Sequence, residues 1–240
     1  MAAAQYSVSL EAALTSKRCH PLVSLLVWQR QQSFFRSDGI NIPRSDCRHH
    51  TILSIYNDSH VRCCFLHCLL HMNHMVHQVI VTGGSGFLGS AVLRALRVKH
   101  ADWDIYNLDS RSPAGNLNVR YEYADITQAD QVDRVFACVK PDLVIHTAGL
   151  SPGGQQRYSN DALIRNHTFS INVDGTKNVV AAARRHDCKC FVYTSSCTVV
   201  TDDQNHDYPY MDESTPIGHA TLVYGSSKVY FMSQRRILEP

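Results

Sequence analysis

The sequence predicts an α/β fold, in which helices cover both faces of a doubly wound parallel sheet. From residue 78 onward, short runs of β-favouring apolar residues alternate with helix-forming runs, which is the pattern of a parallel sheet with crossover helices. The first of these strands, residues 78–82, ends in a glycine cluster at positions 83, 86 and 89, and a helix-forming run follows. A strand, a glycine turn and a helix in this order are typical of a Rossmann-type dinucleotide-binding domain.

Each glycine of this turn has its own task in a dinucleotide site. One allows the tight turn off the strand, one lets backbone N–H groups approach a pyrophosphate, and the third lets the helix pack close to the strand. The N-terminus of the helix adds unpaired N–H donors and a partial positive charge. We therefore expect the cofactor to contact Gly83, Gly86, Phe87, Leu88 and Gly89.

The composition suits a globular protein with a sizeable core, because 44% of the 240 residues are hydrophobic and 18% are charged. The formal net charge of +2 gives no reason to expect a nucleic-acid partner. No apolar run reaches the roughly 18 to 20 residues that span a bilayer. The nine cysteines form no regular framework, so we interpret them as reduced thiols of an intracellular protein.

The first 77 residues differ in composition from the rest of the chain. They hold eight of the fourteen histidines and five of the nine cysteines, and neither a strand period nor a helix period persists along them. We therefore expect residues 1–77 to be a leader of unknown role, irregular or disordered, and residues 78–240 to be the Rossmann domain. The acid-poor opening, which carries Lys17, Arg18 and Arg30, would also suit a mitochondrial transit segment.

A run of Cys and His residues just before position 78 resembles a metal site at first sight. On a helix, Cys64, Cys68 and His71 would share one face, as would His67, His71 and His74. Zinc, however, needs ligands that converge tetrahedrally, usually from two separate elements, and the sequence contains no second cluster. We interpret the run as incidental and predict no metal site.

A helix over residues 87–100 and a second strand over 104–108 follow the glycine turn, and the strand ends at Asp109. This acid lies 20 residues beyond Gly89, the spacing at which a carboxylate accepts hydrogen bonds from an adenosine ribose. A carboxylate there favours NAD and repels the 2′-phosphate of NADP, whereas the nearby Arg111 could pair with that phosphate. The predicted cofactor is NAD, with NADP as the alternative; an aspartate that only caps a turn is the plainer interpretation.

The next two strand ends supply further predicted cofactor contacts. The Asp125 carboxylate, followed by Ile126, could contact the adenine amino group or cap the helix that comes next. Small residues, among them Ala148, follow the fourth strand, and a flat cofactor could lie against them. The expected elements are a strand at 119–124, a helix at 129–139 and a strand at 142–146.

A long helix over residues 162–186 contains Gly175 in its interior. Glycine inside a helix costs about 1 kcal/mol relative to alanine, so Gly175 indicates close packing against a neighbour. A fifth strand at 190–194 brings Ser195 and Ser196 to the carboxyl edge of the sheet. Open α/β sheets bind their ligands at that edge, so we expect a serine hydroxyl to orient the substrate oxygen there.

Tyr224 and Lys228 open the last helix, and residues four apart lie one turn from each other on one face. A phenol has an ordinary pKa of about 10, and a neighbouring ammonium lowers it by favouring the phenolate. Tyr224 could then exchange a proton with an alcohol or a carbonyl near neutral pH. Any helix can contain this pair, so its weight comes from the order of the glycine turn, the acid, the serines and the pair itself.

A set of motifs resembles those of the extended short-chain dehydrogenase/reductase family. They are Thr-Gly-Gly-Ser-Gly-Phe-Leu-Gly at 82–89, His-Thr-Ala-Gly at 146–149, Asn-Val-Asp-Gly-Thr at 172–176, Tyr-Thr-Ser-Ser at 193–196 and Tyr-Gly-Ser-Ser-Lys at 224–228. The stretch 191–228 is similar to the 3β-hydroxysteroid dehydrogenase branch, and within it to the fungal-type sterol-4α-carboxylate 3-dehydrogenases. The resemblance covers residues 78–240 and none of the first 77.

This resemblance implies an oxidoreductase that uses NAD or NADP and acts on the 3β-hydroxyl group of a sterol-like substrate. The catalytic residues would be Ser196, Tyr224 and Lys228, with Ser195 as the rival serine. Lys228 would also hold the nicotinamide ribose, and Asn172 would support the cofactor site. Nucleotide-sugar epimerases and dehydratases share every cofactor motif and are the alternative.

The resemblance also implies a homodimer through the helices at 162–186 and 224–239. It implies a place in the cytoplasm or at the endoplasmic reticulum, with membrane association but no anchor visible in the sequence. Two departures stand out: Met232 occupies a position where the family usually has an acid, and the family continues beyond residue 240. We therefore expect a sixth strand and the substrate domain to be missing, and a catalytically silent nucleotide-binding module is a further alternative.

Overall fold

The computed structural model describes residues 77–153, 156, 159, 161–199, 220 and 222–233, together with two short strands at 24–29 and 51–54. Within these ranges, only the backbone is described for the two short strands, for residue 197 and for residues 231–233. The Cys and His run before position 78 lies outside the described residues, apart from His77, and so does Met232 as a side chain.

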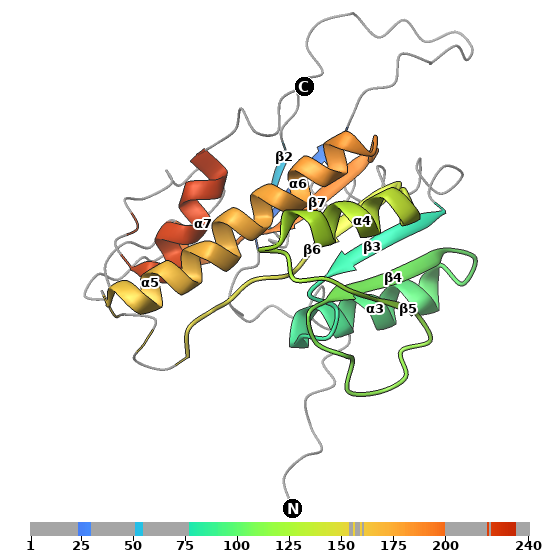
Figure 1. Ribbon diagram of the computed structural model, residues 1–240, viewed down its shortest axis with the longest axis horizontal. Helices are drawn as coiled ribbons and strands as arrows, with labels where there is room; N and C mark the ends of the chain where they lie inside the picture. The colour runs from blue at the N-terminus through green and yellow to red at the C-terminus, as the bar shows by residue number, and fades with distance from the viewer. Residues whose placement is uncertain are drawn as a thin grey trace, which may run out of the picture.

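Five parallel strands form the centre of the molecule and confirm the predicted fold class (Figure 1). Their order across the sheet is β7-β6-β3-β4-β5, so the chain reverses its winding direction between β3 and β6. This reversal is the switch point at which doubly wound sheets bind ligands. The strands are β3 (Gln78–Thr82), β4 (Asp104–Asp109), β5 (Arg120–Tyr123), β6 (Leu143–His146) and β7 (Cys190–Thr194).

Helices cover both faces of this sheet, as the near-continuous apolar strands predict. On one face, Ile80 and Val144 pack with residues of α4 and α6; on the other, Val79 and Val81 pack with Leu93 of α3. Neighbouring strand residues therefore point to opposite faces, and each face has its own core. The helices are α3 (Phe87–Lys99), α4 (Ala129–Val139), α5 (Ala162–Phe169), α6 (Thr176–Arg185) and α7 (Val223–Ser233), with a short η3 (Cys197–Val199) after β7.

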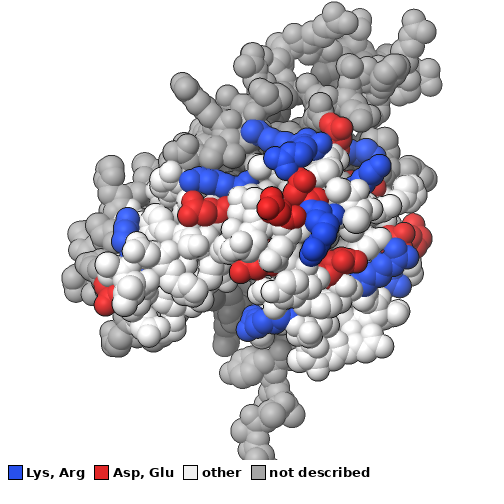
Figure 2. Space-filling model, viewed as in Figure 1, with Lys and Arg blue, Asp and Glu red and all other residues white. Residues whose placement is uncertain are grey.

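The outer face of α4 and α6 carries basic and acidic side chains side by side (Figure 2). One of the ion pairs joins the two helices, because Arg185 of α6 donates to the carboxylate of Asp133 in α4. Another, between Lys177 and Asp174, stays within one helical run. Exposed pairs of this kind contribute little to stability, so the packing of α4 and α6 depends on the apolar core beneath them.

The helix predicted over residues 162–186 is one continuous run that contains a π-helical turn, η2 (Ser170–Gly175), between α5 and α6. The predicted close packing at Gly175 is confirmed: a Cβ added there would lie 2.7 Å from side-chain atoms of Ile126. Wide turns of this type are often found at functional sites, and this one carries Asn172. Phe169 of α5 stacks edge-on against Tyr230 of α7, so the two helices expected to make a dimer contact pack together; the dimer itself stays a prediction.

Two short strands lie within the 77 residues that we expect to be irregular or disordered. Strands β1 (Ser24–Gln29) and β2 (Thr51–Ser54) pair with each other, and β1 lies antiparallel to β7 at the edge of the sheet. The run Leu-Leu-Val-Trp within β1 is β-favouring but too short to show a period. β1 pairs with β7, which is more than 150 residues away in the sequence, so the pairing could not be predicted from the residues of β1 alone.

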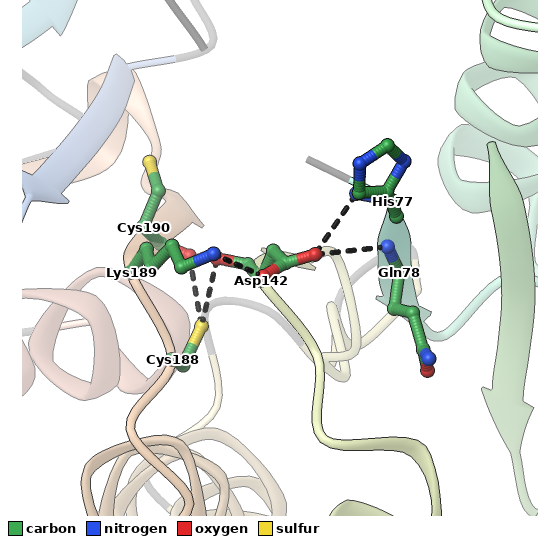
Figure 3. A network of polar contacts seen from close by, with 6 residues as sticks. All are labelled: His77, Gln78, Asp142, Cys188, Lys189 and Cys190. Carbon is green, nitrogen blue, oxygen red and sulfur yellow. Dashed lines mark hydrogen bonds and ion pairs between the residues drawn. The ribbon is translucent and has the colours of Figure 1, made fainter. Parts of the chain in front are cut away.

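At the amino ends of the strands, Asp142 fastens three neighbouring strands together (Figure 3). Its Oδ2 accepts the backbone N–H groups of His77 and Gln78 at 2.9 and 3.1 Å, and its Oδ1 accepts from Lys189 Nζ at 2.7 Å. Its backbone carbonyl accepts the N–H groups of Lys189 and Cys190, both at 3.0 Å. The residue predicted as the first of strand β6 therefore acts as a link between β3, β6 and β7.

Candidate active site

The predicted site residues lie at the opposite, carboxyl edge of the sheet. Strand β3 leads into the glycine turn, β6 into the small residues 147–149, and β7 into Ser195 and Ser196. Because β3, β6 and β7 are hydrogen-bonded neighbours, these three strand ends meet at the switch point.

The glycine turn is held tightly against the end of β6. Gly83 has a φ of +71°, and a Cβ added to it would lie 2.7 Å from the backbone of Ala148, so only glycine fits. A Cβ on Gly89 would overlap the carbonyl oxygen of Gly83, which is the close approach of helix and strand that the sequence predicted. The Gly86 N–H donates to Gly83 O at 3.0 Å and closes the turn.

The N-terminus of α3 is open toward solvent. Within this described turn no side chain caps the helix, the N-cap residue is Gly86, and the first turn holds no acid. Phe87 is 93% exposed and Leu88 also lies at the surface. The first N–H groups of a helix have no partner inside it, so this end offers donors and a positive dipole end to a pyrophosphate. The turn therefore fits a dinucleotide, since no side chain caps the helix and its first turn carries no acid.

Asp109 ties the glycine turn to the loop after β4. Its Oδ2 accepts the Ser85 N–H at 3.0 Å and its Oδ1 accepts the Arg111 N–H at 2.9 Å. The second bond is the turn cap that formed the plainer interpretation, and it coexists with the predicted role because each carboxylate oxygen can accept further bonds. The sequence reasoning missed Asn107 and Ser85, which extend this link: Asn107 Nδ2 donates to Ser85 Oγ, and that hydroxyl donates to Arg111 O.

Asp125 and Ile126 shape the turn after β5. Asp125 Oδ1 accepts both the N–H and the hydroxyl of Thr127, at 2.9 and 2.8 Å. The alternative that Asp125 caps α4 is wrong, because the N-cap residue of that helix is Gln128. Ile126 is buried and its side chain packs against Gly175. Contact of either residue with an adenine ring stays a prediction.

Asn172 supports the loop that follows β6. Its side chain pairs with the backbone of Leu150 through both ends of the amide, accepting the N–H at 2.7 Å and donating to the carbonyl at 2.9 Å. The same Nδ2 donates to Ser227 Oγ in α7 at 2.9 Å. Asn172 is thus a buried link between the turn beside Ala148 and the helix of Tyr224 and Lys228. Direct contact with a cofactor stays a prediction.

Tyr224 and Lys228 lie together, as their spacing predicts. Lys228 Nζ is 5.8 Å from the centre of the Tyr224 ring and donates to Thr194 O, at the end of β7, at 3.1 Å. The lysine is only 4% exposed, and burial lowers the pKa of its ammonium from 10.5 to about 8. A cation at this position favours the phenolate form of Tyr224.

The two candidate serines differ in their surroundings. Ser195 is buried, whereas Ser196 is half-buried and its Oγ accepts from the N–H and the hydroxyl of Thr198, at 3.2 and 3.0 Å. These bonds hold Ser196 just before η3, and its hydroxyl hydrogen is one that a serine can donate to a substrate oxygen. Which serine faces a substrate stays a prediction.

A cluster of buried polar side chains beside this site was also not predicted from the sequence. It comprises Thr82, His146, Thr176 and Ser227, and all of them are buried. One signal was present: strand β6 is apolar throughout but ends in a histidine, and a polar residue in a fully covered strand needs partners.

Two negative findings apply to the described part of the chain only. There, no group of three or more His, Cys, Asp and Glu side chains is placed to hold a metal ion. Among the same residues, no helix combines the length and the apolar character that crossing a membrane requires.

The chain is similar to known proteins over the described domain. A family model described as "NAD dependent epimerase/dehydratase family" matches residues 79–237. The chain is 32% identical over 169 residues to the sterol-4-alpha-carboxylate 3-dehydrogenase erg26, decarboxylating, of Schizosaccharomyces pombe, covering 68% of this chain and 46% of that protein. It is 29% identical over 174 residues to the dTDP-glucose 4,6-dehydratase of Shigella flexneri, covering 65% of this chain and 47% of the relative.

Solved structures agree with these matches. The UDP-glucose 4-epimerase from Bifidobacterium longum, in complex with NAD+ and UDP, is similar with a TM-score of 0.54 and 26% identity, over 67% of this chain and 47% of that one. The chain spans about half the length of the curated relatives that it matches.

Proposed function

Because the chain belongs to the NAD-dependent epimerase/dehydratase family, we propose that it binds NAD and catalyses the oxidation of a 3β-hydroxyl group on a sterol. The proposed substrate is a 3β-hydroxysteroid or a sterol-4α-carboxylate. The family match confirms the predicted extended short-chain dehydrogenase/reductase family, and NAD is the cofactor of that family. The sterol substrate, the catalytic residues and the membrane association at the endoplasmic reticulum are proposals.

The single observation that supports catalysis best is the buried Lys228 ammonium beside the Tyr224 ring, at the carboxyl end of β7. In the proposed reaction the phenolate of Tyr224 takes the proton of the substrate hydroxyl. Lys228 stabilises that phenolate by its charge. Ser196, or its rival Ser195, donates a hydrogen bond that orients the substrate oxygen. NAD, when bound, accepts the hydride from the carbinol carbon.

The Asp109 carboxylate supports NAD over NADP. It is fixed by two backbone N–H groups at the end of β4, and its charge would repel a 2′-phosphate. The guanidinium of Arg111 is exposed, so it remains the group through which NADP could be accepted.

The sterol substrate is proposed because the Schizosaccharomyces pombe relative, a sterol-4-alpha-carboxylate 3-dehydrogenase, is 32% identical over 68% of this chain. A second candidate function is the epimerisation or dehydration of a nucleotide sugar, which the dehydratase and epimerase relatives favour at 29% and 30% identity. Both reactions begin with removal of a proton and a hydride from a carbinol, so the tyrosine and lysine serve either one.

The test is turnover by the purified 240-residue chain. We expect a 3β-hydroxysterol 4α-carboxylate with NAD+ to give NADH, and we expect Tyr224→Phe to lower kcat by at least about 100-fold because the base is lost, with the Kd for NAD unchanged. UDP-glucose and dTDP-glucose are tested in parallel. Turnover of a nucleotide sugar but no sterol would assign the second function. A chain that binds NAD but converts none of these substrates would be a silent nucleotide-binding module and would overturn the proposal.

A further inference from the structure

His146 lies at the centre of a buried chain of hydrogen bonds between the glycine turn and the Tyr224 helix. Its Nδ1 is 2.7 Å from the Thr82 hydroxyl, at the end of β3, and its Nε2 is 3.0 Å from the Thr176 hydroxyl, at the start of α6. All three side chains are buried within the fold. Buried polar atoms need partners, and here both ring nitrogens have one.

The hydrogen bonds around the ring determine which nitrogen carries the hydrogen. The Thr176 hydroxyl donates its hydrogen to Asn172 O at 2.7 Å, so it can only accept from His146. Nε2 must therefore be the N–H nitrogen. On the other side, Thr82 Oγ1 accepts the N–H of Ala148 at 3.3 Å and keeps its own hydrogen for Nδ1. A neutral imidazole with its hydrogen on Nε2 satisfies every partner.

A charged imidazolium does not suit this place. It would put a second hydrogen on Nδ1, and the hydroxyl hydrogen of Thr82 would then face an N–H donor. The titratable groups that face the ring are Lys228, from α7, and Tyr193, whose ring stacks at 5.8 Å from β7. Burial, with a smaller contribution from the Lys228 charge, lowers the pKa of His146 from 6.5 to about 3.

Beyond Thr176 the chain of bonds reaches the catalytic helix. The residue that accepts from Thr176, Asn172, holds Leu150 through its side chain and donates to Ser227 Oγ at 2.9 Å. Ser227 in turn donates to the backbone carbonyl of Tyr224 at 2.7 Å. The end of β3, the loop after β6, the π-helical turn and the first turn of α7 are thus joined without an intervening gap.

We propose that His146, as the neutral Nε2–H imidazole between Thr82 and Thr176, is a positioning residue that fixes the Tyr224 helix relative to the glycine turn. Its side chain is fully buried, and it acts through Thr176, Asn172 and Ser227. An effect of His146 on catalysis rests on the proposed function. The tautomer of His146 and the hydrogen-bonded link to the Tyr224 helix do not.

The tautomer is tested by ¹⁵N NMR of the histidine-labelled chain, with the His146 signals identified by their loss in His146→Gln. We expect the hydrogen to be on Nε2 and not on Nδ1. We also expect the ring to stay neutral as the pH is lowered through about 6.5, the pH at which an ordinary histidine becomes charged. A hydrogen on Nδ1, or titration near the ordinary value, would overturn the proposal. This result does not depend on NAD binding or turnover, so it separates the two proposals.

The link to the catalytic helix is tested with a matched pair of variants. Thr176→Val removes the partner of His146 Nε2, and Thr168→Val is its control: Thr168 is equally buried and also donates to a helix carbonyl one turn back, that of Ile164. We expect amide hydrogen exchange of residues 223–230 to quicken in Thr176→Val and to stay unchanged in Thr168→Val. Equal exchange in the two variants would contradict the link, whether or not the chain turns over a substrate.

Where the chain is active, the same pair separates positioning from stability. Misplacing a catalytic group by about 1 Å can cost about 100-fold in rate. We expect kcat to fall at least about tenfold in Thr176→Val, while its KM for NAD stays close to that of the wild type. In Thr168→Val we expect kcat to be unchanged. A loss of thermal stability in both variants without this difference in kcat would mean that the histidine is only structural.

Discussion

At the scale of single residues, Lys228 shows how the fold prepares a side chain for chemistry at a cost in stability. The ammonium is almost fully buried, yet among the described residues its partners are the carbonyl of Thr194 and the faces of the Tyr193 and Tyr224 rings. Burial disfavours its charged form, so the native state holds this proton less tightly than the unfolded chain does. Burying this lysine therefore lowers the stability of the fold, while its charge stabilises the phenolate of Tyr224.

This assignment predicts a pH dependence of the free energy of unfolding. Between pH 8 and 10.5 the unfolded chain binds the lysine proton more than the native chain does, so stability rises with pH across this window. Relative to Lys228→Met, which lacks the titration, the wild type should gain about 3 kcal/mol over that range. Denaturant unfolding of both proteins at several pH values measures it. A constant difference between them would mean that the native lysine has an ordinary pKa.

At the scale of elements, the sequence predicted the five parallel strands and their helices well because each has a local signal. Apolar runs, the glycine turn and the spacing of Tyr224 and Lys228 are all readable from neighbouring residues. The structure places the five strands and the helices at 87–99, 129–139 and 162–185 within a residue or two of the prediction, and α7 begins one residue before its predicted start. The π-helical turn, the Asp142 link and the His146 chain were not predictable. Each depends on partners far apart in sequence, such as Thr82 with His146 or Asp142 with Gln78.

The close packing of Gly175 against Ile126 predicts that a larger residue at position 175 destabilises the π-helical turn. Alanine at 175 would favour the helix by about 1 kcal/mol, but its methyl group would lie 2.7 Å from Ile126, and overpacking costs about 1 to 3 kcal/mol. We expect Gly175→Ala to destabilise the chain in thermal unfolding and Ile126→Val to relieve part of that loss in the double variant. Gly115→Ala, with no atom within 4 Å of the new methyl group, is the control. If Gly175→Ala stabilises the protein, the close packing is not a constraint.

At the scale of the whole molecule, the two edges of the sheet have different tasks. The carboxyl edge carries the glycine turn, Asp109 and the Tyr224–Lys228 pair. The amino edge carries the Asp142 link, which joins β3, β6 and β7 (Figure 3). Burial would raise the pKa of Asp142, but the bonds from Lys189 and from two backbone N–H groups outweigh it and hold the pKa below its ordinary value.

Removing that link should affect stability but not the cofactor site. We expect Asp142→Ala to lower the free energy of unfolding by about 2 to 3 kcal/mol, since a charged acceptor of several hydrogen bonds is lost. The exposed Asp130→Ala should stay within about 0.5 kcal/mol of the wild type. The contribution of Asp142 should be present above pH 3.8 and lost as the pH falls through its lowered native pKa. If Asp142→Ala changes the Kd for NAD while unfolding is unaffected, the two edges are not separate.

The central claim is that the glycine turn at the carboxyl edge binds the pyrophosphate of NAD. Isothermal titration of the full chain with NAD tests it most directly, with Gly86→Val and Gly115→Ala alongside. The backbone of Gly86 is extended, and a Cβ added there would lie 3.1 Å from Gly83 O. The added side chain would stand where the pyrophosphate approaches, so the variant is compared only after thermal unfolding has shown that it folds. We predict saturable binding by the wild type and by Gly115→Ala, and at least about tenfold weaker binding by Gly86→Val, which is about 1.4 kcal/mol or more. No saturation of the folded wild type by millimolar NAD or NADP would contradict the account.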